Sequence, residues 1–271
     1  MVRPTAVLSV DVECFSHIPA YRNAHGSLAG SDTDVGLSAI EVLLDRYDAY
    51  DAVGTFFVVS DIAERHPEII TRIVDAGHEI GSHTHRHVHL SEIDTAERRD
   101  ELRTSRETLE RVADSPVTGF RAPSFDITTD HFTELAAAGY EYDSSIVPCR
   151  SIPGWYGGEH TVQEPAPASR FVEGAPSTVT ELPVAVMPGL RLPLTGTWLR
   201  FFGVKYTILG MKLLARRGIV PILYIHPWEL VDLPRVDGVP RRVYWRTGEW
   251  LQNAVERILS ERFTFVPMNS L

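Results

Sequence analysis

The amino-acid sequence predicts a single α/β domain built as a parallel β/α barrel. Apolar strand-length runs alternate with segments of helical periodicity along the chain. The runs are nearly all apolar, as expected for strands covered on both faces. Polar residues follow one strand after another, at the strand ends where β/α barrels carry their sites. The 271 residues suit one large domain, and we place no boundary within residues 1–271.

Composition excludes several classes of protein. The chain is 44% hydrophobic and 23% charged, which is typical of a soluble globular protein. Its net charge of −10 argues against nucleic-acid binding and gives no support to polybasic attachment to lipid. The two cysteines, Cys14 and Cys149, make no disulfide framework. No transmembrane stretch or signal peptide is visible, so we expect a cytoplasmic protein, with peripheral attachment to the inner membrane face as an alternative.

The first predicted strand, residues 6–10, leads directly into two carboxylates. Alternation along an extended chain places Asp11 and Glu13 on the same side of the strand end. Two adjacent carboxylates repel each other unless a cation or a proton lies between them. One carboxylate would then be a metal ligand and the other a base. The alternative is a solvated acidic pair, or one that caps a helix.

Residues 77–87 form a histidine-rich stretch. A polar loop over 14–34 precedes a helix over 36–47, a strand over 54–59, and a helix that starts near Asp61 and runs past Pro67 to Gly77. His83 and His87 are four residues apart, a spacing that lets two imidazoles face one ion. A zinc site needs a third protein ligand, which the rest of the chain must supply. The alternative is a polar loop with solvated histidines.

The middle of the chain repeats the strand-and-helix pattern. A helix over 94–112 carries a run of charges that we interpret as a solvated face. A strand over 117–120 ends at Arg121, which either holds a carboxylate through paired hydrogen bonds or makes an ordinary surface salt bridge. A helix over 130–138 precedes a strand-like segment, 140–146, that contains Asp143.

Residues 148–178 are rich in proline and glycine and predict a long loop. Such loops in compact domains tend to be functional or disordered. The loop contains Trp155, Tyr156 and Phe171. These aromatic rings either stack on sugar rings, so that the loop shapes a substrate groove, or pin the loop to the body of the protein.

The last third of the chain returns to alternation. Strand character resumes at 181–184, and residues 198–217 are apolar with basic residues interspersed. We interpret this segment as a core helix with a basic end, and a helix on a membrane surface is the alternative. A strand over 220–225 leads to His226, followed by a helix over 248–259 and a strand over 263–266.

Five segments, in order, resemble the motifs of the polysaccharide deacetylases with a NodB homology domain, carbohydrate esterase family 4. The resemblance covers the chain from about residue 7 to residue 265 and is strongest for the branch whose first motif is Asp-x-Glu. Each motif is weak alone, and their order and separations make the resemblance specific. The segments are Ser9 to Glu13, Gly77 to His87, Gly119 to Phe125, Tyr142 to Ile146, and Leu223 to Glu229.

The resemblance implies an incomplete, distorted β/α barrel of about seven strands. It also implies a metal-dependent hydrolase that removes N-acetyl groups from an amino-sugar polysaccharide or its precursor. Asp11 would be the general base, oriented by Arg121. His226 would protonate the leaving amine and would be tuned by Asp143.

The remaining implied roles concern the metal and the substrate. Zinc, or alternatively Co²⁺, Ni²⁺ or Mn²⁺, would bind to Glu13, His83 and His87. The backbone N–H near Ser124 would help to bind the oxyanion, with Phe125 and Trp228 in the substrate region.

The sequence departs from the family pattern at several places. Glu13 replaces the usual aspartate ligand, and Ser124 stands where many relatives have tyrosine. His85 and His89 are alternative ligands. Two other functions stay open: an amide hydrolase of the allantoinase kind acting on a non-sugar substrate, and a non-catalytic glycan-binding barrel. The retained ligands argue against the first, and the retained base and acid argue against the second.

Overall fold

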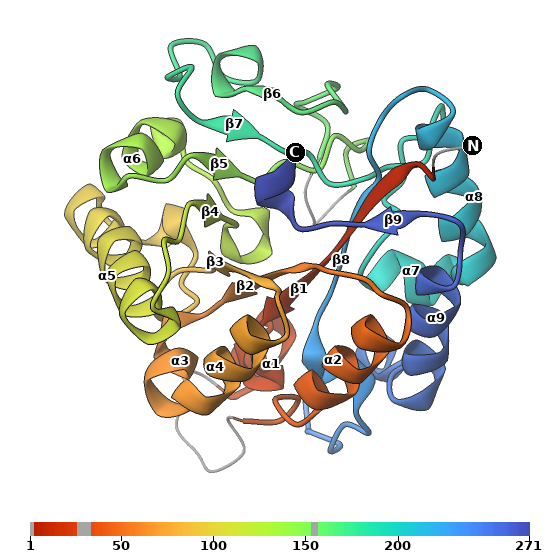
Figure 1. Ribbon diagram of the computed structural model, residues 1–271. Coiled ribbons are helices and arrows are strands. Elements are labelled where there is room, and N and C mark those ends of the chain that lie inside the picture. Colours follow the sequence, from red (N-terminus) through yellow and green to blue (C-terminus); the bar gives the residue numbers. More distant parts are fainter. Residues whose placement is uncertain (1–2, 26–33, 153–156) are drawn as a thin grey trace.

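One curled sheet forms the centre of the protein (Figure 1). The computed structural model describes residues 3–25, 34–152 and 157–271. Its strands follow the order β6-β7-β5-β4-β3-β2-β1-β8, and β9 pairs with the first residues of β1. The strands are β1 (Thr5–Val12), β2 (Thr55–Val58), β3 (Glu79–Ser82), β4 (Gly119–Phe120), β5 (Tyr142–Asp143), β6 (Ala166–Pro167), β7 (Thr180–Glu181), β8 (Ile222–Ile225) and β9 (Thr264–Phe265).

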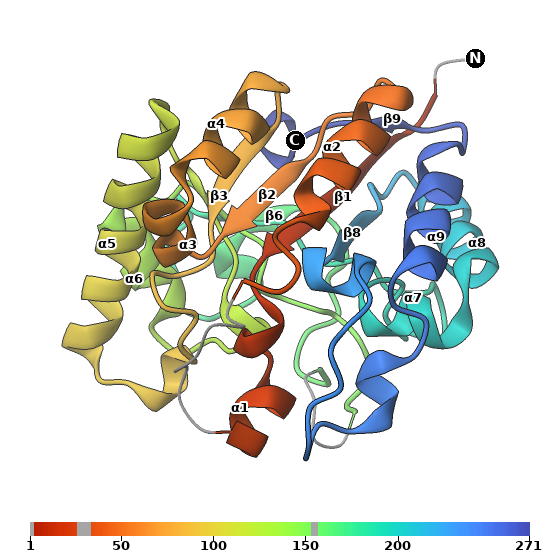
Figure 2. The ribbon, with the colours of Figure 1, turned by 90° about the horizontal axis from the view of Figure 1, so that it is seen from below.

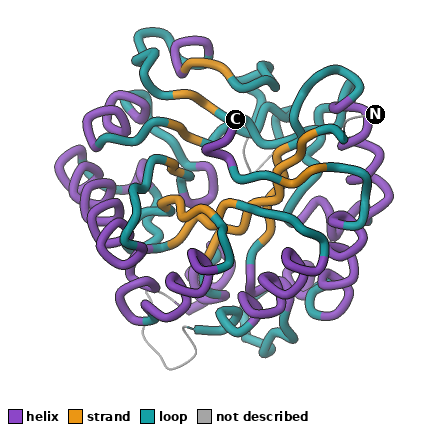
Figure 3. Tube along the Cα trace, viewed as in Figure 1, coloured by secondary structure: helices purple, strands orange, loops and turns teal. Residues whose placement is uncertain are grey.

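The sheet confirms the predicted incomplete, distorted β/α barrel. Every strand pair is parallel except β6 with β7, and the sheet curls into a half-barrel with helices around it (Figures 1 and 3). The described residues form nine strands rather than about seven. One of the additional strands, β6, lies inside the predicted long loop, where it pairs with β7.

The helices cover the outside of the sheet, as Figure 2 shows from a second direction. They are α1 (Pro19–His25), α2 (Ala39–Ala49), α3 (Ser60–Arg65), α4 (Pro67–Asp75), α5 (Thr95–Ala113), α6 (His131–Ala138), α7 (Thr197–Phe202), α8 (Val204–Ala215) and α9 (Glu249–Leu259). None of the helices in the described ranges is long and apolar enough to cross a membrane.

Two of the predicted helices are each divided in the structure. The helix expected to run past Pro67 is α3 and α4, because proline lacks an N–H and disfavours a helical conformation at His66, whose φ is −134°. The helix expected over 198–217 is α7 and α8, because Gly203 between them has a φ of +87°. Only glycine adopts this conformation readily.

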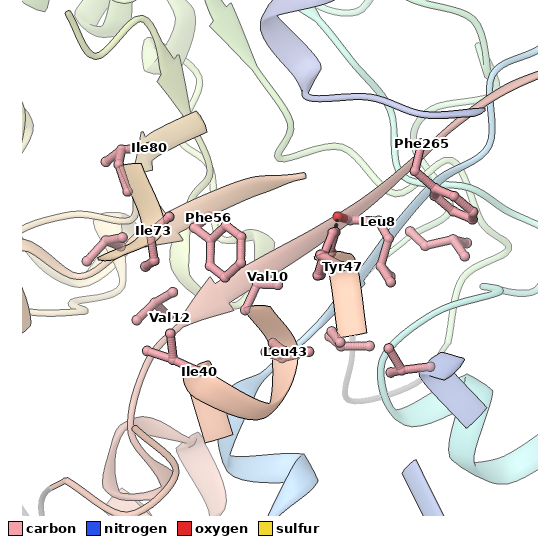
Figure 4. Close-up of a cluster of buried hydrophobic side chains, with 14 of the residues drawn as sticks. Leu8, Val10, Val12, Ile40, Leu43, Tyr47, Phe56, Ile73, Ile80 and Phe265 are labelled. Carbon is pink, nitrogen blue, oxygen red and sulfur yellow. Dashed lines mark hydrogen bonds between the residues drawn. The ribbon is translucent and has the colours of Figure 1, made fainter. Parts of the chain in front are cut away.

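The two faces of β1 have different surroundings. Leu8, Val10 and Val12 point outward into the main hydrophobic core, against α2 and the neighbouring strands (Figure 4). In that core the hydroxyl of Tyr47 donates to the Leu8 carbonyl oxygen at 2.6 Å. The alternate residues of β1 point to the other face, where Val7 joins a smaller cluster. Asp11 therefore lies on the inner face of the half-barrel.

Strand register brings the polar strand ends together. Val10 pairs with Ile225, Val12 with Val58, and Ser82 with Phe120. Because these pairs are parallel, the residues that follow each strand emerge at the same end of the sheet. The candidate site residues lie at this end of the sheet: Asp11 and Asp143 are in the last two residues of their strands, and Glu13, His83, Arg121 and His226 directly follow theirs.

The predicted loop over 148–178 is partly described. Trp155 and Tyr156 lie outside the described residues. Phe171 is half-buried and packs against the main core, with its ring centroid 6.1 Å from that of His160. Phe171 therefore attaches the loop to the body of the protein.

Candidate metal centre and active site

Two turns with unusual backbone carry the motif residues. Thr84 and His87 have φ values of +63° and +53°, and Ser124 and Phe125 have +55° and +59°. Left-handed backbone at non-glycine residues is uncommon and persists where surrounding contacts enforce it, often at functional sites. The two turns are joined by a contact of 3.1 Å between His89 Nε2 and Ser124 Oγ.

A buried carboxylate holds the histidine turn. Glu101 on α5 accepts hydrogen bonds from the backbone N–H groups of His85 and Arg86, at 2.9 and 3.0 Å. Its side chain is 1% exposed, so the interpretation of this whole charged run as a solvated face is wrong at Glu101. The turn needs this acceptor because its backbone leaves N–H groups outside regular secondary structure.

Glu13, His83 and His87 form a group that could hold a metal ion. Their ligand atoms all lie within 4.8 Å of one another, and all three residues are buried. The Nε2 atom of His87 is in direct contact with Glu13 Oε2, and His83 Nε2 lies 3.9 Å from the same oxygen. Two imidazoles and one carboxylate, with room for water, are a common donor set of catalytic zinc.

The hydrogen bonds of these residues fit metal binding. His83 Nδ1 lies 2.7 Å from the carbonyl oxygen of Arg121, which can only accept, so Nδ1 carries the proton and Nε2 keeps its lone pair. His87 Nε2 faces Glu13 Oε2, and His87 Nδ1 is buried without a hydrogen-bond partner among the described residues. A cation bound between Nε2 and Oε2 would accept a lone pair from each of these two atoms.

Electrostatics within the group favour an ionised carboxylate and a neutral imidazole. Burial alone would raise the pKa of Glu13, but His87, His226 and His83 together hold it well below its ordinary value. Burial lowers the pKa of His83 to about 4. Both groups are therefore in the protonation state that a metal ligand requires at neutral pH.

The alternative ligands His85 and His89 face other partners. His85 Nδ1 is 2.8 Å from Ser60 Oγ, and His89 is near Ser124 and Glu92. Sequence reasoning missed a different histidine: His17 is buried, and its ring stacks on that of His87 at 5.1 Å. Burial, followed by the charge of His87, lowers the pKa of His17 to about 3, so His17 forms a neutral wall of the site.

A fully buried arginine positions Asp11. Arg121 Nη1 donates to Asp11 Oδ1 at 2.6 Å and to Ser9 Oγ at 2.8 Å. Two further donors of the guanidinium bond to the carbonyl and hydroxyl oxygens of Ser144, and its centre lies 4.3 Å from the centroid of the Phe57 ring. This excludes the alternative of a surface salt bridge, because the Arg121 side chain is 0% exposed.

His226 completes the inner face from the opposite end of the sequence. Its Nε2 lies 4.0 Å from Asp11 Oδ2 and 3.7 Å from Glu13 Oε1. Burial alone would lower its pKa, but Glu229, Glu13 and Asp11 raise it to about 9. His226 is thus protonated at neutral pH, which is the state of a general acid.

The carboxylate beside His226 Nδ1 is Glu229 rather than Asp143. Glu229 Oε2 lies 2.9 Å from Nδ1, and Glu229 Oε1 lies 2.7 Å from Nε of Arg200. Arg200 is buried and also donates to the carbonyl oxygens of Val243 and Trp245. Sequence reasoning assigned no role to Glu229 or Arg200, although the three-residue spacing from His226 to Glu229 was a local signal.

Asp143, which was expected to tune His226, contacts His131 and Ser145. Asp143 Oδ2 lies 3.1 Å from Nε2 of the buried His131, and Asp143 Oδ1 accepts a hydrogen bond from Ser145 at 2.6 Å. Burial, followed by the negative charge of Asp143, raises the pKa of Glu181 well above its ordinary value. Asp143 therefore belongs to a buried polar cluster beneath the strand ends.

The remaining predicted residues are Trp228, Phe125 and Ser124, of which Trp228 contacts His226. The Trp228 ring stacks on that of His226 at 5.2 Å, and its Nε1 donates to Glu13 Oε1 at 2.9 Å. Phe125 packs edge-on against Tyr224 at 5.2 Å. Ser124 is exposed. Trp228 thus contacts both His226 and the candidate metal group.

Comparison with known families matches both halves of the chain. A family model described as polysaccharide deacetylase matches residues 34–142. A second model, described as a domain of unknown function (DUF3473), matches residues 144–271. The second segment contains β8 and His226, so it contributes to the site assembled at the strand ends.

Curated relatives match over limited stretches. A peptidoglycan-N-acetylglucosamine deacetylase of Bacillus cereus is 35% identical over 71 residues, which is 26% of this chain and 26% of the relative. A peptidoglycan deacetylase of Helicobacter pylori is 31% identical over 130 residues, 45% of this chain and 44% of the relative. A chitooligosaccharide deacetylase of Bradyrhizobium is 33% identical over 98 residues, which is 36% of this chain and 45% of the relative. The chain thus spans less than half the length of these relatives.

Solved structures share the fold over nearly the whole chain. A Mycobacterium smegmatis structure described as a polysaccharide deacetylase has a TM-score of 0.69 at 23% identity and covers 99% of this chain and 88% of that one. An allantoinase has a TM-score of 0.66 at 17% identity, and the match covers 99% of this chain and 89% of the allantoinase chain. The family model, the relatives and the shared fold agree. Residues 34–142 are therefore similar to polysaccharide deacetylases, and the whole chain shares the fold of these solved structures.

Proposed function

We propose that this protein is a metal-dependent hydrolase that removes N-acetyl groups from an amino-sugar polysaccharide or its precursor. The observation that carries the proposal is the position of His226 Nε2, which lies 4.0 Å from Asp11 and 3.7 Å from Glu13. A base, an acid and a candidate metal group thus converge on one point. A glycan-binding protein without catalysis has no need of this convergence.

The contacts of each candidate catalytic residue support a role in this reaction. Asp11, held by Arg121, accepts a proton from the attacking water. A bound divalent cation supplies positive charge that lowers the pKa of water and stabilises the oxyanion. His226 donates the proton from Nε2 to the departing nitrogen, while its Nδ1 proton is directed to Glu229. Without that proton, the amine is a poor leaving group.

We propose Glu13, His83 and His87 as the ligands and zinc as the metal. The donor set of two imidazoles and one carboxylate supports this choice, because zinc favours nitrogen donors in a site of low coordination number. Co²⁺, Ni²⁺ and Mn²⁺ are the alternatives. Metal analysis of the purified protein decides between them, and metal content that stays at background would contradict the ligand assignment.

The substrate proposal rests on the named relatives, which act on peptidoglycan and chitooligosaccharides. We infer that the substrate of this chain is a glycan that contains N-acetylglucosamine. We also propose that residues 1–271 fold as one domain. This is supported by the pairing of β1 with β8, which joins the two segments matched by different family models.

The function is tested by acetate release from N-acetylglucosamine oligomers, peptidoglycan fragments and nucleotide sugars. We expect release from at least one oligomer, and loss of release after chelation with recovery when zinc is added. Asp11→Asn is the matched inactive control. Hydrolysis of a non-sugar amide in place of these substrates would favour the allantoinase-like alternative, and glycan binding without acetate release would favour the binding alternative.

A further inference from the structure

One long segment of this acidic protein contains no acidic residue. Residues 182–228 have neither aspartate nor glutamate, although the whole chain has 36 of them and a net charge of −10. The same segment has six basic residues, including Lys205 and Lys212, the only lysines of the chain. Arg200 is buried and Arg191 is half-buried, and the other four, Lys205, Lys212, Arg216 and Arg217, are exposed and form a local positive surface. Such a surface attracts anions over about 10 Å at moderate salt.

The structure places this segment at the periphery of the molecule. Helices α7 and α8 lie on the outer side of the fold (Figures 1 and 2). One side of α8 is buried, with Ile208, Met211 and Leu214 in the main core. The burial of these residues confirms the expectation that this segment forms a helix packed on the core. Lys205, Leu209 and Lys212 of α8 are exposed, as are Phe201 and Phe202 at the end of α7, and we name these five residues the α7–α8 face.

Large apolar side chains are exposed on this face. Phe201, Phe202 and Leu209 are 51%, 46% and 53% exposed. The rings of Trp198 and Tyr206 flank Phe202, with centroids at 5.8 and 4.7 Å. A cluster of exposed aromatic and aliphatic side chains is a feature of surfaces that bind a partner or a membrane.

A neighbouring loop extends the apolar area. Leu190 is 52% exposed, and the carbonyl oxygen of Leu192 in the same loop accepts a hydrogen bond from the Tyr206 hydroxyl. Four of the six most exposed large apolar residues of the described chain therefore lie between residues 190 and 209.

Basic residues accompany the apolar ones. Lys205 lies between Phe201 and Leu209 in the sequence and makes no ion pair within the described ranges. Lys212 pairs with Glu261 at 2.7 Å, and Arg216 and Arg217 are exposed at the end of α8. Apolar residues flanked by lysine and arginine, in a segment whose sequence contains no acidic residue, are typical of helices that lie on anionic membranes.

We propose that the α7–α8 face binds the surface of a membrane that contains anionic lipids. The apolar side chains enter the interface between headgroups and acyl chains, and Lys205, Arg216 and Arg217 face the lipid phosphates. The positive charge of this face favours an anionic membrane as the partner. Most of the remaining surface of this acidic chain would repel such a membrane, so the protein binds in one orientation. The proposal is independent of the proposed hydrolase activity.

Flotation with lipid vesicles tests the proposal. We expect the protein to float with vesicles of phosphatidylcholine mixed with phosphatidylglycerol, to float far less with phosphatidylcholine alone, and to be released by high salt. Replacing Phe201, Phe202 and Leu209 together with serine should lower the partition coefficient at least tenfold. Lys205→Glu should lower it at least about fivefold on anionic vesicles and have little effect on neutral ones.

Controls separate binding from misfolding. Trp245→Ser removes an equally exposed ring outside the segment, and Arg170→Glu reverses an exposed charge elsewhere; both should bind as the wild type does. If the triple variant unfolds, Lys205→Glu still decides the question. A wild type that stays unbound with anionic vesicles overturns the proposal. The same holds if Lys205→Glu binds as well as Arg170→Glu. A triple variant that changes only the oligomeric state shows that the face binds protein instead.

Discussion

His226 Nε2 and Asp11 Oδ2 lie 4.0 Å apart, although 215 positions separate them in the sequence. The pairing of Val10 with Ile225 creates this proximity, because Asp11 and His226 each follow one member of this pair by one position. The acid and the base of the proposed reaction are thus placed by strand register. The first prediction tests both.

Asp11→Asn and His226→Ala should each lower kcat by about 10²–10⁴-fold, because each removes one proton-transfer group. Metal content and glycan affinity should be nearly unchanged, since neither residue belongs to the proposed ligand group. Steady-state acetate release and metal analysis of each variant provide the measurements. An Asp11→Asn protein with the wild-type kcat would falsify the proposed mechanism.

His83→Ala and His87→Ala should each strongly reduce metal retention, and the double variant should abolish it. Both remove a nitrogen donor from the buried group, while the fold, which rests on the main core, should persist. His85→Ala and His89→Ala are matched controls because they lie in the same segment but contact Ser60 and Ser124. The ligand assignment is wrong if the double variant still holds one zinc per chain.

The pH dependence of catalysis should change in Glu229→Gln. The Glu229 carboxylate raises the pKa of His226, so activity should fall at alkaline pH as the acid loses its proton. Removing the charge lowers the His226 pKa and moves the alkaline limb of kcat/KM to lower pH. Glu249→Gln, an exposed change on α9, should leave the limb in place. If the alkaline limb of kcat/KM in Glu229→Gln stays at the wild-type pH, Glu229 does not set the pKa of His226.

Acid should destabilise the folded protein partly through His78. Burial lowers the pKa of His78 from 6.5 to about 4, and its Nδ1 accepts a hydrogen bond from Gly54 N–H at 3.1 Å. The unfolded chain therefore takes up a proton below pH 6.5 that the folded chain refuses until about pH 4. Stability falls as pH falls through this window, by roughly 2 kcal/mol near about pH 5 from this group.

The variant that isolates this effect is His78→Asn, which keeps a hydrogen-bond acceptor but does not titrate. Urea unfolding at several pH values should show a smaller loss of stability between neutral and acidic pH than in the wild type. Parallel pH profiles for the two proteins would assign the acid sensitivity to other groups, of which the buried His17 and His83 are the first to consider.

Sequence alone predicted the parts of this protein that depend on local pattern. Buried strands of period two place Asp11 and Glu13 on one face, and the spacing of His83 and His87 predicts a shared ligand position. The strand ends then meet because the sheet is parallel. These inferences need no knowledge of distant contacts.

The errors arose where a side chain finds its partner across the fold. Glu101 stands in a run of charges that looks solvated, yet it is buried against the histidine turn. Arg200 lies in an apolar segment, and its pairing with Glu229 joins residues from α7 and the end of β8. Asp143 was assigned by its position after a strand, but His131 contacts it instead. Periodicity does not encode such pairings.

The pairing of β1 with β8 also limits how this chain can be recombined. The proposed base and metal ligands come from the part of the chain before residue 144, and the proposed acid comes from the part after it. A chimera that joins the first part to the second part of a distant relative would keep every motif. It would still be inactive unless the donor strand repeats the register of Val7 with Ile222 and Val10 with Ile225. The activity of such a chimera thus depends on the register between its two parts as well as on its motifs.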